Sequence, residues 1–275
     1  MLFTTGPEIG HARIGGIALK WIEQNILVRA LIEAVPLPDS VGYLTMADSG
    51  GQFNIQNLQP GRYIVYATAD DNGDRRRGFR EAYDSMQITL DSTSNVALYT
   101  FPHDTVPPRP RAATFVDSIT VRVEFSQALD PTASFDTAHV HVLQLPDSTP
   151  VAIAQILTQR QFDSVNTVAR QKADSAAAAA RDTGVPPPRI HPTVPPPPPS
   201  VDTTLVRQLL ARRPVPSDKI VIRLAQPLKA ETRYVVRIEG ATNLSGRKGG
   251  GEVSFGVPKP TAPPDTTHRA RRTPP

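Results

Sequence analysis

Alternating polar and apolar residues predict β-strands along most of this chain, most clearly between residues 51 and 70. Residues 52–55 (QFNI) alternate polar and apolar side chains, which is the pattern of a half-buried strand. Residues 60–61 (PG) then predict a turn, because proline fixes φ and glycine accepts a positive φ without steric cost. Residues 63–68 (YIVYAT) alternate again and are rich in β-formers. This stretch therefore predicts two consecutive strands of an all-β domain.

Comparable strand patterns recur with turn signals about every 8–12 residues, which is typical of β-sandwiches. The first series covers residues 12–19, 26–34, 42–47, 51–56, 61–70, 86–90 and 95–101. The second covers residues 118–125, 139–145, 150–156, 218–225, 232–240 and 252–257. We therefore predict an all-β protein of two β-sandwich domains. We expect their cores to contain Phe53, Tyr63, Val65, Val121, Val123, Phe125, Tyr234, Val236 and Phe255.

A segment of different composition, residues 157–216, interrupts the second series. Its first part, which includes ARQKADSAAAAAR, has the highest helix propensity of the chain, and Gly184 is expected to end that helix. The following VPPPRIHPTVPPPPPS cannot form a helix or a central strand. Residues 201–213 predict a second short helix. We interpret the whole as a solvent-exposed helical and proline-rich insertion in the second domain.

The composition excludes several classes of function. The chain has 275 residues and no cysteine, so disulfides, thiol catalysis and cysteine-bound metals are excluded. Its net charge is only +4, which gives little support for specific nucleic-acid binding. No apolar run approaches the roughly 18–20 residues that span a bilayer. The composition thus leaves a structural or binding protein without a transmembrane segment as the simplest interpretation.

Motifs in the second series resemble bacterial Ig-like domains of the surface-layer and adhesin type. Such domains open with Asp-x-x-Pro-Pro, continue with an inner strand and an acidic-proline pair, and close with Pro-Leu-x-x-x-Thr-x-Tyr, Gly-x-x-Asn-x-x-Gly and Ser-Phe. The matching positions are Asp104, Pro107 and Pro108, residues 120–125, Asp130 and Pro131, Pro227, Leu228, Thr232 and Tyr234, Gly240, Asn243 and Gly246, and Ser254 and Phe255.

The first series resembles carboxypeptidase-regulatory-like (transthyretin-like) sandwiches. The resemblance is carried by Gly50, Gly51 and Phe53, by Leu58, by Pro60, Gly61 and Tyr63, and by Asp70. In bacterial surface proteins this module commonly follows an Ig-like domain that ends in Phe-x-Thr-Gly-Pro. Residues 3–7 (FTTGP) match that ending.

Together the two resemblances imply a domain order. Residues 1–9 would be the remnant strand of a preceding Ig-like domain, 10–101 the carboxypeptidase-regulatory-like sandwich and 102–110 a stiff linker; 111–156 plus 217–257 would form the Ig-like sandwich, 157–216 its insertion and 258–275 a disordered tail. The first 20 residues lack the pattern of a signal peptide. We therefore expect the chain to be the C-terminal part of a longer exported protein of the cell envelope (outer-membrane or periplasmic) or extracellular space.

One acidic turn has the spacing of a calcium loop. Asp70, Asn72 and Asp74 stand at positions 1, 3 and 5 of such a loop, and Glu81 stands at position 12. The arginines at 75–77 oppose a cation, and the first of them replaces the glycine that the loop needs. The alternative is a turn whose side chains cap its own backbone. No other cofactor is indicated.

Other reactive groups also have structural alternatives. His139 and His141 could share a strand face and chelate a transition metal, or simply be solvated. Residues 48–51 (DSGG) superficially match a serine-protease nucleophile loop, but the neighbouring pattern predicts a hairpin turn. Residues 249–251 (GGG) lack the spacing of a phosphate loop and predict a flexible hairpin tip. The proline run 195–199 is either a spacer or a ligand for an aromatic groove.

These observations predict a non-enzymatic structural and adhesion protein that acts as a rigid spacer and surface contact module. Its partners would be other envelope proteins or surface polymers, which the basic motif at 268–272 (HRARR) could contact by charge. The alternative is a carbohydrate- or peptide-binding module accessory to an enzyme or surface complex. Its candidate aromatic side chains are Trp21, Tyr43 and Tyr83.

Overall fold

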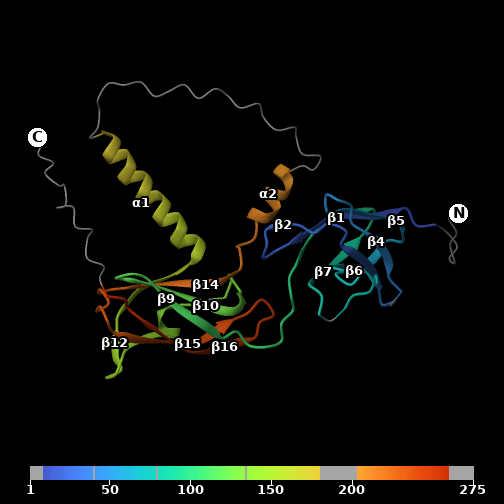
Figure 1. The fold of residues 1–275 in the computed structure, drawn as a ribbon. Coiled ribbons are helices and arrows are strands. Elements are labelled where there is room, and N and C mark those ends of the chain that lie inside the picture. The colour runs from blue at the N-terminus through green and yellow to red at the C-terminus, as the bar shows by residue number, and fades with distance from the viewer. Residues whose placement is uncertain (1–8, 40, 79, 134, 180–202, 260–275) are drawn as a thin grey trace, which may run out of the picture.

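The computed structural model describes residues 9–39, 41–78, 80–133, 135–179 and 203–259. Their strands form four sheets, and the sheets pack in two pairs that each enclose a hydrophobic core (Figure 1). The pairing is antiparallel except between β1 and β8, which run parallel. The predicted all-β sandwich architecture is therefore confirmed.

The first sandwich consists of two sheets, which we call sheet A and sheet B. Sheet A contains β1 (Ala12–Lys20), β2 (Asn25–Ile26), β5 (Gln52–Leu58) and β8 (Thr93–Thr100). Sheet B contains β3 (Leu31–Leu37), β4 (Tyr43–Met46), β6 (Gly61–Thr68) and β7 (Tyr83–Leu90). The predicted strand at 26–34 is split into β2 and β3, because the chain turns at Arg29, which has a φ of 55°.

The second sandwich pairs sheet C with sheet D. Sheet C contains β9 (Pro110–Asp117), β10 (Thr120–Leu129), β13 (Ile153–Thr158) and β14 (Ser217–Leu224). Sheet D contains β11 (Val140–Gln144), β12 (Thr149–Val151), β15 (Arg233–Thr242) and β16 (Lys248–Gly256). A single 3-10 turn, η1 (Thr137–His139), precedes β11.

Both cores are built as the alternation predicted, since all nine of the expected core residues are buried. Tyr63 anchors the first core, where its hydroxyl donates to the Gln59 carbonyl oxygen at 2.7 Å. Tyr234 anchors the second core and stacks against Phe255 with ring centroids 5.5 Å apart. A buried tyrosine contributes a large apolar surface and needs a partner for its hydroxyl, and both conditions are met here.

The insertion contributes two helices, α1 (Gln159–Ala179) and α2 (Thr203–Ala211). Helix α1 begins directly after β13 and extends away from the second sandwich (Figure 1). Phe162, near the start of the helix, packs with Leu157 and Val221 of sheet C. Neither helix of the described segments is both long and apolar enough to cross a membrane. The expectation that the insertion is solvent-exposed is wrong for α2, because Val206, Leu209 and Leu210 are buried.

The glycine run at 249–251 corrects a second expectation. These residues lie within β16 rather than at a hairpin tip, and Gly249 is paired with Ala241 of β15. A Cβ atom on Gly249 would lie 2.2 Å from the Pro108 carbonyl oxygen. Glycine is therefore required here because the proline-rich segment before β9 lies directly against the strand.

Candidate functional site

The outer face of sheet A carries an apolar surface that the rest of the first sandwich does not cover. Strand β1 alternates, so Ile14 and Ala18 face the core whereas Ile17 and Leu19 face outward. Tyr99 of β8 is aligned with Leu19 in the parallel ladder and lies in the same outer cluster. An apolar patch of this kind on a soluble domain normally marks a contact surface.

Helix α2 covers this surface. Leu209 and Leu210 follow Val206 by three and four residues, so the three side chains share one helix face. They form a buried cluster with the outward residues of the first sandwich, Ile17, Leu19, Trp21 and Tyr99. The insertion leaves the second sandwich after β13 and rejoins it at β14, so α2 bridges the two sandwiches (Figure 1).

Polar and cationic contacts fix the end of α2 in place. The Tyr99 hydroxyl donates to the Leu209 carbonyl oxygen at 2.8 Å, and Trp21 Nε1 donates to the Pro214 carbonyl oxygen at 3.1 Å. The Arg213 guanidinium carbon lies 4.3 Å from the Tyr99 ring centroid and 5.5 Å from that of Trp21. Such cation–π contacts add attraction to the hydrophobic burial.

A second connection runs through the segment between β8 and β9. On the side of the first sandwich, His103 stacks on Tyr83 and Phe101, with ring centroids 3.7 Å and 4.2 Å away. Phe101 in turn meets Trp21 edge-on at 5.6 Å. The first residues after β8 are therefore packed against the first sandwich and do not form a free tether.

On the side of the second sandwich, Asn243 holds the same segment. Its side chain is 1% exposed and makes five hydrogen bonds. Nδ2 donates to the carbonyl oxygens of Asp104 and Val106 and to Gln127 Oε1, at 2.9, 3.2 and 3.0 Å. Oδ1 accepts from the backbone N–H groups of Ser245 and Arg247, at 3.0 and 2.8 Å. The asparagine of the Gly-x-x-Asn-x-x-Gly motif thus ties the linker to the β15–β16 turn.

Acidification is expected to weaken this junction at His103. Burial lowers the pKa of His103, because the charged ring would lose its hydration between Tyr83 and Phe101. The folded protein therefore binds fewer protons at this site than the unfolded chain. The free energy of unfolding is therefore highest above pH 6.5, the pKa of the histidine in the unfolded chain. It decreases as the pH falls from 6.5 through the lower pKa of His103 in the folded protein. Thermal melts across this range should show a falling Tm, and His103→Phe should reduce the fall.

Asp84 lies near His103 and also has a shifted pKa, so the pH experiment needs a control for its contribution. Burial raises the pKa of Asp84, whose carboxylate accepts from Tyr99 N–H at 2.7 Å and faces His103 and Arg213. A raised carboxyl pKa acts in the opposite direction, because stability then falls as the pH rises above the unfolded value of 3.8. Asp84→Asn should therefore leave the acid-side loss in place, whereas an unchanged loss in His103→Phe would contradict the assignment to histidine.

An open cleft of about 620 Å³ lies where α2 leaves part of the outer face of sheet A uncovered. The floor comes from β1, β5 and β8, and the roof comes from Leu205 and Leu209 of α2 and from Arg212 just beyond the helix. Its polar lining consists of Arg13, Gln52, Asn54, Asn95 and Arg212. The sequence analysis missed this cleft, because its residues belong to three separate strands and to the insertion.

The acidic loop between β6 and β7 contains all four residues suggested for calcium, and Asp70, Asn72 and Asp74 lie in its first half. Each of the three accepts hydrogen bonds from backbone N–H groups of its own loop, as the capping alternative describes. The bonds are Arg75 N–H to Asp70 Oδ2 (3.2 Å), Asp74 N–H to Asn72 Oδ1 (2.8 Å) and Arg76 N–H to Asp74 Oδ1 (2.7 Å). The neighbouring Arg77 guanidinium lies 3.6 Å from the Tyr66 ring centroid.

Glu81, the fourth residue, is buried near the end of the same loop. One carboxylate oxygen accepts from Gly78 N–H at 2.7 Å, while Oε1 has no hydrogen-bond partner among the residues that the structure describes. In the part of the chain that the structure describes, no group of three or more His, Cys, Asp or Glu side chains could hold a metal ion. Calcium binding by Asp70, Asn72, Asp74 and Glu81 stays a prediction.

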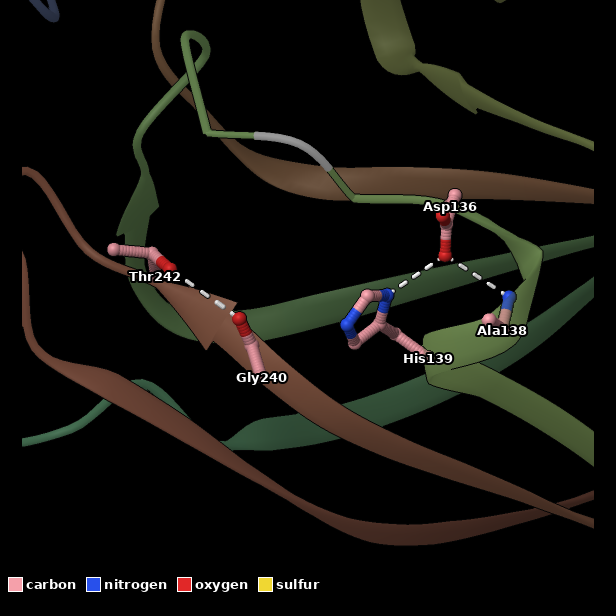
Figure 2. A network of polar contacts seen from close by, with 5 residues as sticks. All are labelled: Asp136, Ala138, His139, Gly240 and Thr242. Carbon is pink, nitrogen blue, oxygen red and sulfur yellow. Dashed lines mark hydrogen bonds and ion pairs between the residues drawn. The ribbon is translucent and has the colours of Figure 1, made fainter.

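The two histidines do not share a strand face as expected. His139 lies in η1, before β11 begins, and its Nδ1 is 2.7 Å from Asp136 Oδ1 (Figure 2). This contact, together with the Ala138 N–H, lowers the pKa of Asp136. His141 lies on β11 and is paired with Arg237 of β15. The geometry that suggested chelation is therefore absent from this pair.

The loop at 48–51 is a turn, and it leads from β4 in sheet B to β5 in sheet A. Asp48 Oδ1 accepts from the N–H groups of Gly50 and Gln52, at 2.8 and 2.9 Å. The segment that matched a nucleophile loop is therefore a turn that the Asp48 side chain caps. Residues 195–199, 268–272 and the motif at 3–7 lie outside the described residues, as does Gly184.

The three aromatic residues suggested for sugar stacking do not form a platform. Trp21 is buried beneath Arg213 and bonded to Pro214, so its ring is unavailable to a ligand. Tyr83 is stacked on His103. Tyr43 is 41% exposed but lies on β4 of the opposite sheet. The three rings therefore cannot bind one sugar chain together.

No family model and no curated protein matches the chain. Among solved structures it is similar to the N-terminal part of the bacterial S-layer protein SbsC, with a TM-score of 0.33, 11% identity and coverage of 57% of this chain and 24% of that one. It is also similar to BcpA, the major pilin subunit of Bacillus cereus, with a TM-score of 0.28, 10% identity and coverage of 88% of this chain and 67% of that one. A DUF3823 family protein from Parabacteroides merdae gives a TM-score of 0.27, 15% identity and coverage of 50% of this chain and 67% of that one. The chain thus spans about a quarter of the S-layer fragment, and scores at this level assign no function.

Proposed function

We propose that this chain is a non-enzymatic structural protein of the cell envelope or extracellular space. Its two β-sandwiches would act together as one rigid spacer that offers surfaces for contact with envelope proteins or polymers. The observation that carries this proposal is the double connection between the sandwiches. The 101–108 segment joins them once, and α2 joins them a second time.

A double connection matters mechanically. Two domains joined by one linker are expected to move relative to each other unless their interface is large and apolar. Here α2 buries three aliphatic side chains on the first sandwich, and Asn243 fixes the linker on the second. Asp84 and His103, whose pKa values burial shifts, lie in this packed junction. Their environment therefore has a structural explanation and does not require a catalytic one.

Rigidity is tested by a distance measurement between the sandwiches. The chain has no native cysteine, so spin labels can be placed cleanly at Thr89→Cys on β7 and Ser254→Cys on β16, both exposed. We expect a single narrow distance distribution. The same labels in a Leu209→Asp background should give a broad distribution, because α2 loses its apolar contact. A broad distribution in the otherwise unchanged chain would contradict the spacer proposal.

The location is tested in the organism that makes the protein. Cell fractionation and protease treatment of intact cells should place the chain in the envelope or outside the cell. Recovery only in the cytosolic fraction, protected from the protease, would contradict this part of the proposal.

A further inference from the structure

The cleft between α2 and sheet A has the composition of a ligand site. We propose that it binds an acidic oligosaccharide, a chain of hydroxyl-rich sugars that carries carboxylates. This inference gives the proposed surface-contact role a ligand class and rests on that role, because the cleft exists only while α2 is docked.

A glycine lies at the centre of the cleft floor, between two asparagines of the neighbouring strands. Gly15 of β1 is paired with Asn54 of β5 on one side and with Asn95 of β8 on the other. Adjacent strands are about 4.8 Å apart, so the two asparagine backbones are separated by roughly 10 Å. A Cβ atom at position 15 would lie 2.8 Å from Asn95 Oδ1. The glycine thus keeps a trough open between two amide side chains.

The amides supply hydrogen bonds of the kind that sugars need. Asn and Gln side chains each offer two donors and an acceptor, and sugar hydroxyls both donate and accept. Gln52 extends the row, since it is paired with Ile17 one step further along the strands. Within the described residues, the side chains of Gln52, Asn54 and Asn95 make no hydrogen bond to another protein group. They are therefore available to a ligand.

The charges in the cleft select an anion. Arg13 lines the floor and Arg212 lines the roof, whereas no aspartate or glutamate belongs to the lining. Arg13 Nε donates to Thr93 Oγ1 at 3.3 Å, which orients its guanidinium, and its other N–H groups have no hydrogen-bond partner among the described residues. Guanidinium groups bind carboxylates through paired hydrogen bonds. The ligand should therefore combine hydroxyls with carboxylates.

The shape of the floor disfavours an extended peptide. Peptides commonly bind to β-proteins by adding a strand at a sheet edge, where backbone groups are unpaired. This cleft lies over a sheet face, and the floor strand β1 is paired on both sides. Recognition must therefore come from side chains. The small apolar surfaces of Ile17, Ala97 and Leu205 can cover the face of a sugar ring.

Binding of a defined oligogalacturonate by the full chain, measured by isothermal titration calorimetry, tests this proposal. A neutral galactan oligomer of equal length serves as the ligand control. We expect the acidic oligomer to bind and Arg212→Ala and Asn95→Ala each to weaken it by about tenfold or more, as expected for the loss of a hydrogen bond to a charged or buried ligand group. Arg207→Ala and Gln56→Ala are matched controls and should change affinity by less than about twofold. Arg207 lies on α2 and Gln56 lies on β5, two elements that border the cleft, and both side chains are exposed and do not line it.

Three outcomes would overturn the proposal: no binding of the acidic oligomer, equal binding of the neutral one, or equal weakening by the cleft and control variants. Trp21 fluorescence of each variant reports whether α2 is still docked, so a folding defect is recognised. Failure here is distinguishable from failure of the spacer proposal. A narrow spin-label distance distribution without oligogalacturonate binding would contradict the ligand proposal alone. A broad distribution would contradict the spacer proposal.

Discussion

Asn243→Ala is expected to destabilise the second sandwich by on the order of 3 kcal/mol, because it leaves several buried polar groups without partners. The asparagine side chain is almost fully buried and serves two purposes at once. Its Oδ1 closes the turn between β15 and β16, and its Nδ2 holds the carbonyl oxygens of Asp104 and Val106. Urea unfolding, followed by circular dichroism, measures the loss.

Asn243→Asp separates the two purposes. Aspartate keeps an acceptor for the Ser245 and Arg247 N–H groups, but its second oxygen would face three acceptor oxygens that in the native protein are hydrogen-bonded to Nδ2. We therefore expect it to be at least as destabilising as alanine and to release the linker. Asn166→Ala, on an exposed part of α1, is the control and should change stability by less than about 0.5 kcal/mol. A similarly small effect of Asn243→Ala would show that the linker is not held by this side chain.

Leu209→Asp is expected to detach α2 from the first sandwich. Truncating a buried leucine to alanine typically costs about 2–5 kcal/mol, and burying an unpaired carboxylate adds to that cost. Leu209 packs beside Leu210 and Val206 on the outer face of sheet A. Because a short helix such as α2 depends on tertiary packing for its stability, loss of this contact should also loosen the helix itself.

Trp21 reports this detachment directly, since it is the single tryptophan of the chain. Its Nε1 is bonded to Pro214 just beyond α2, and Arg213 lies over its ring. In Leu209→Asp we expect the emission to move to longer wavelength and to become accessible to acrylamide. Arg207→Asp changes the charge on the exposed side of the same helix and should leave both signals unchanged. Unchanged emission in Leu209→Asp would contradict the docked position of α2.

The strands and cores of this protein are largely determined by local sequence. Residues 52–55 and 63–68 alternate with period two because one face of each strand is buried, so their burial can be predicted without knowing the partner strands. Strand β9 was missed, since residues 110–117 begin with proline and alternate poorly. It forms because β10 offers a paired edge from Val121 to Phe125.

The candidate sites depended far more on tertiary structure. The spacing of Asp70, Asn72 and Asp74 is visible in the sequence, but whether their oxygens point toward a cation or toward their own backbone is decided by the loop conformation. His139 and His141 are two residues apart, yet only His141 lies on a strand, because His139 belongs to the 3-10 turn before it. The triple glycine suggested a loop, and only the position of Pro108 shows why a strand needs glycine there.

The sequence by itself determined that this chain folds as two β-sandwiches with a helical insertion, because strand and helix patterns reflect local burial and propensity. It also predicted a second short helix at residues 201–213. Only the tertiary structure showed that this helix buries an apolar face on the first sandwich, because Trp21, which bonds to Pro214 just after the helix, lies 193 residues away from it in the sequence. Contacts between residues so far apart in the sequence depend on how the sheets are arranged in space, and they create both the junction and the cleft.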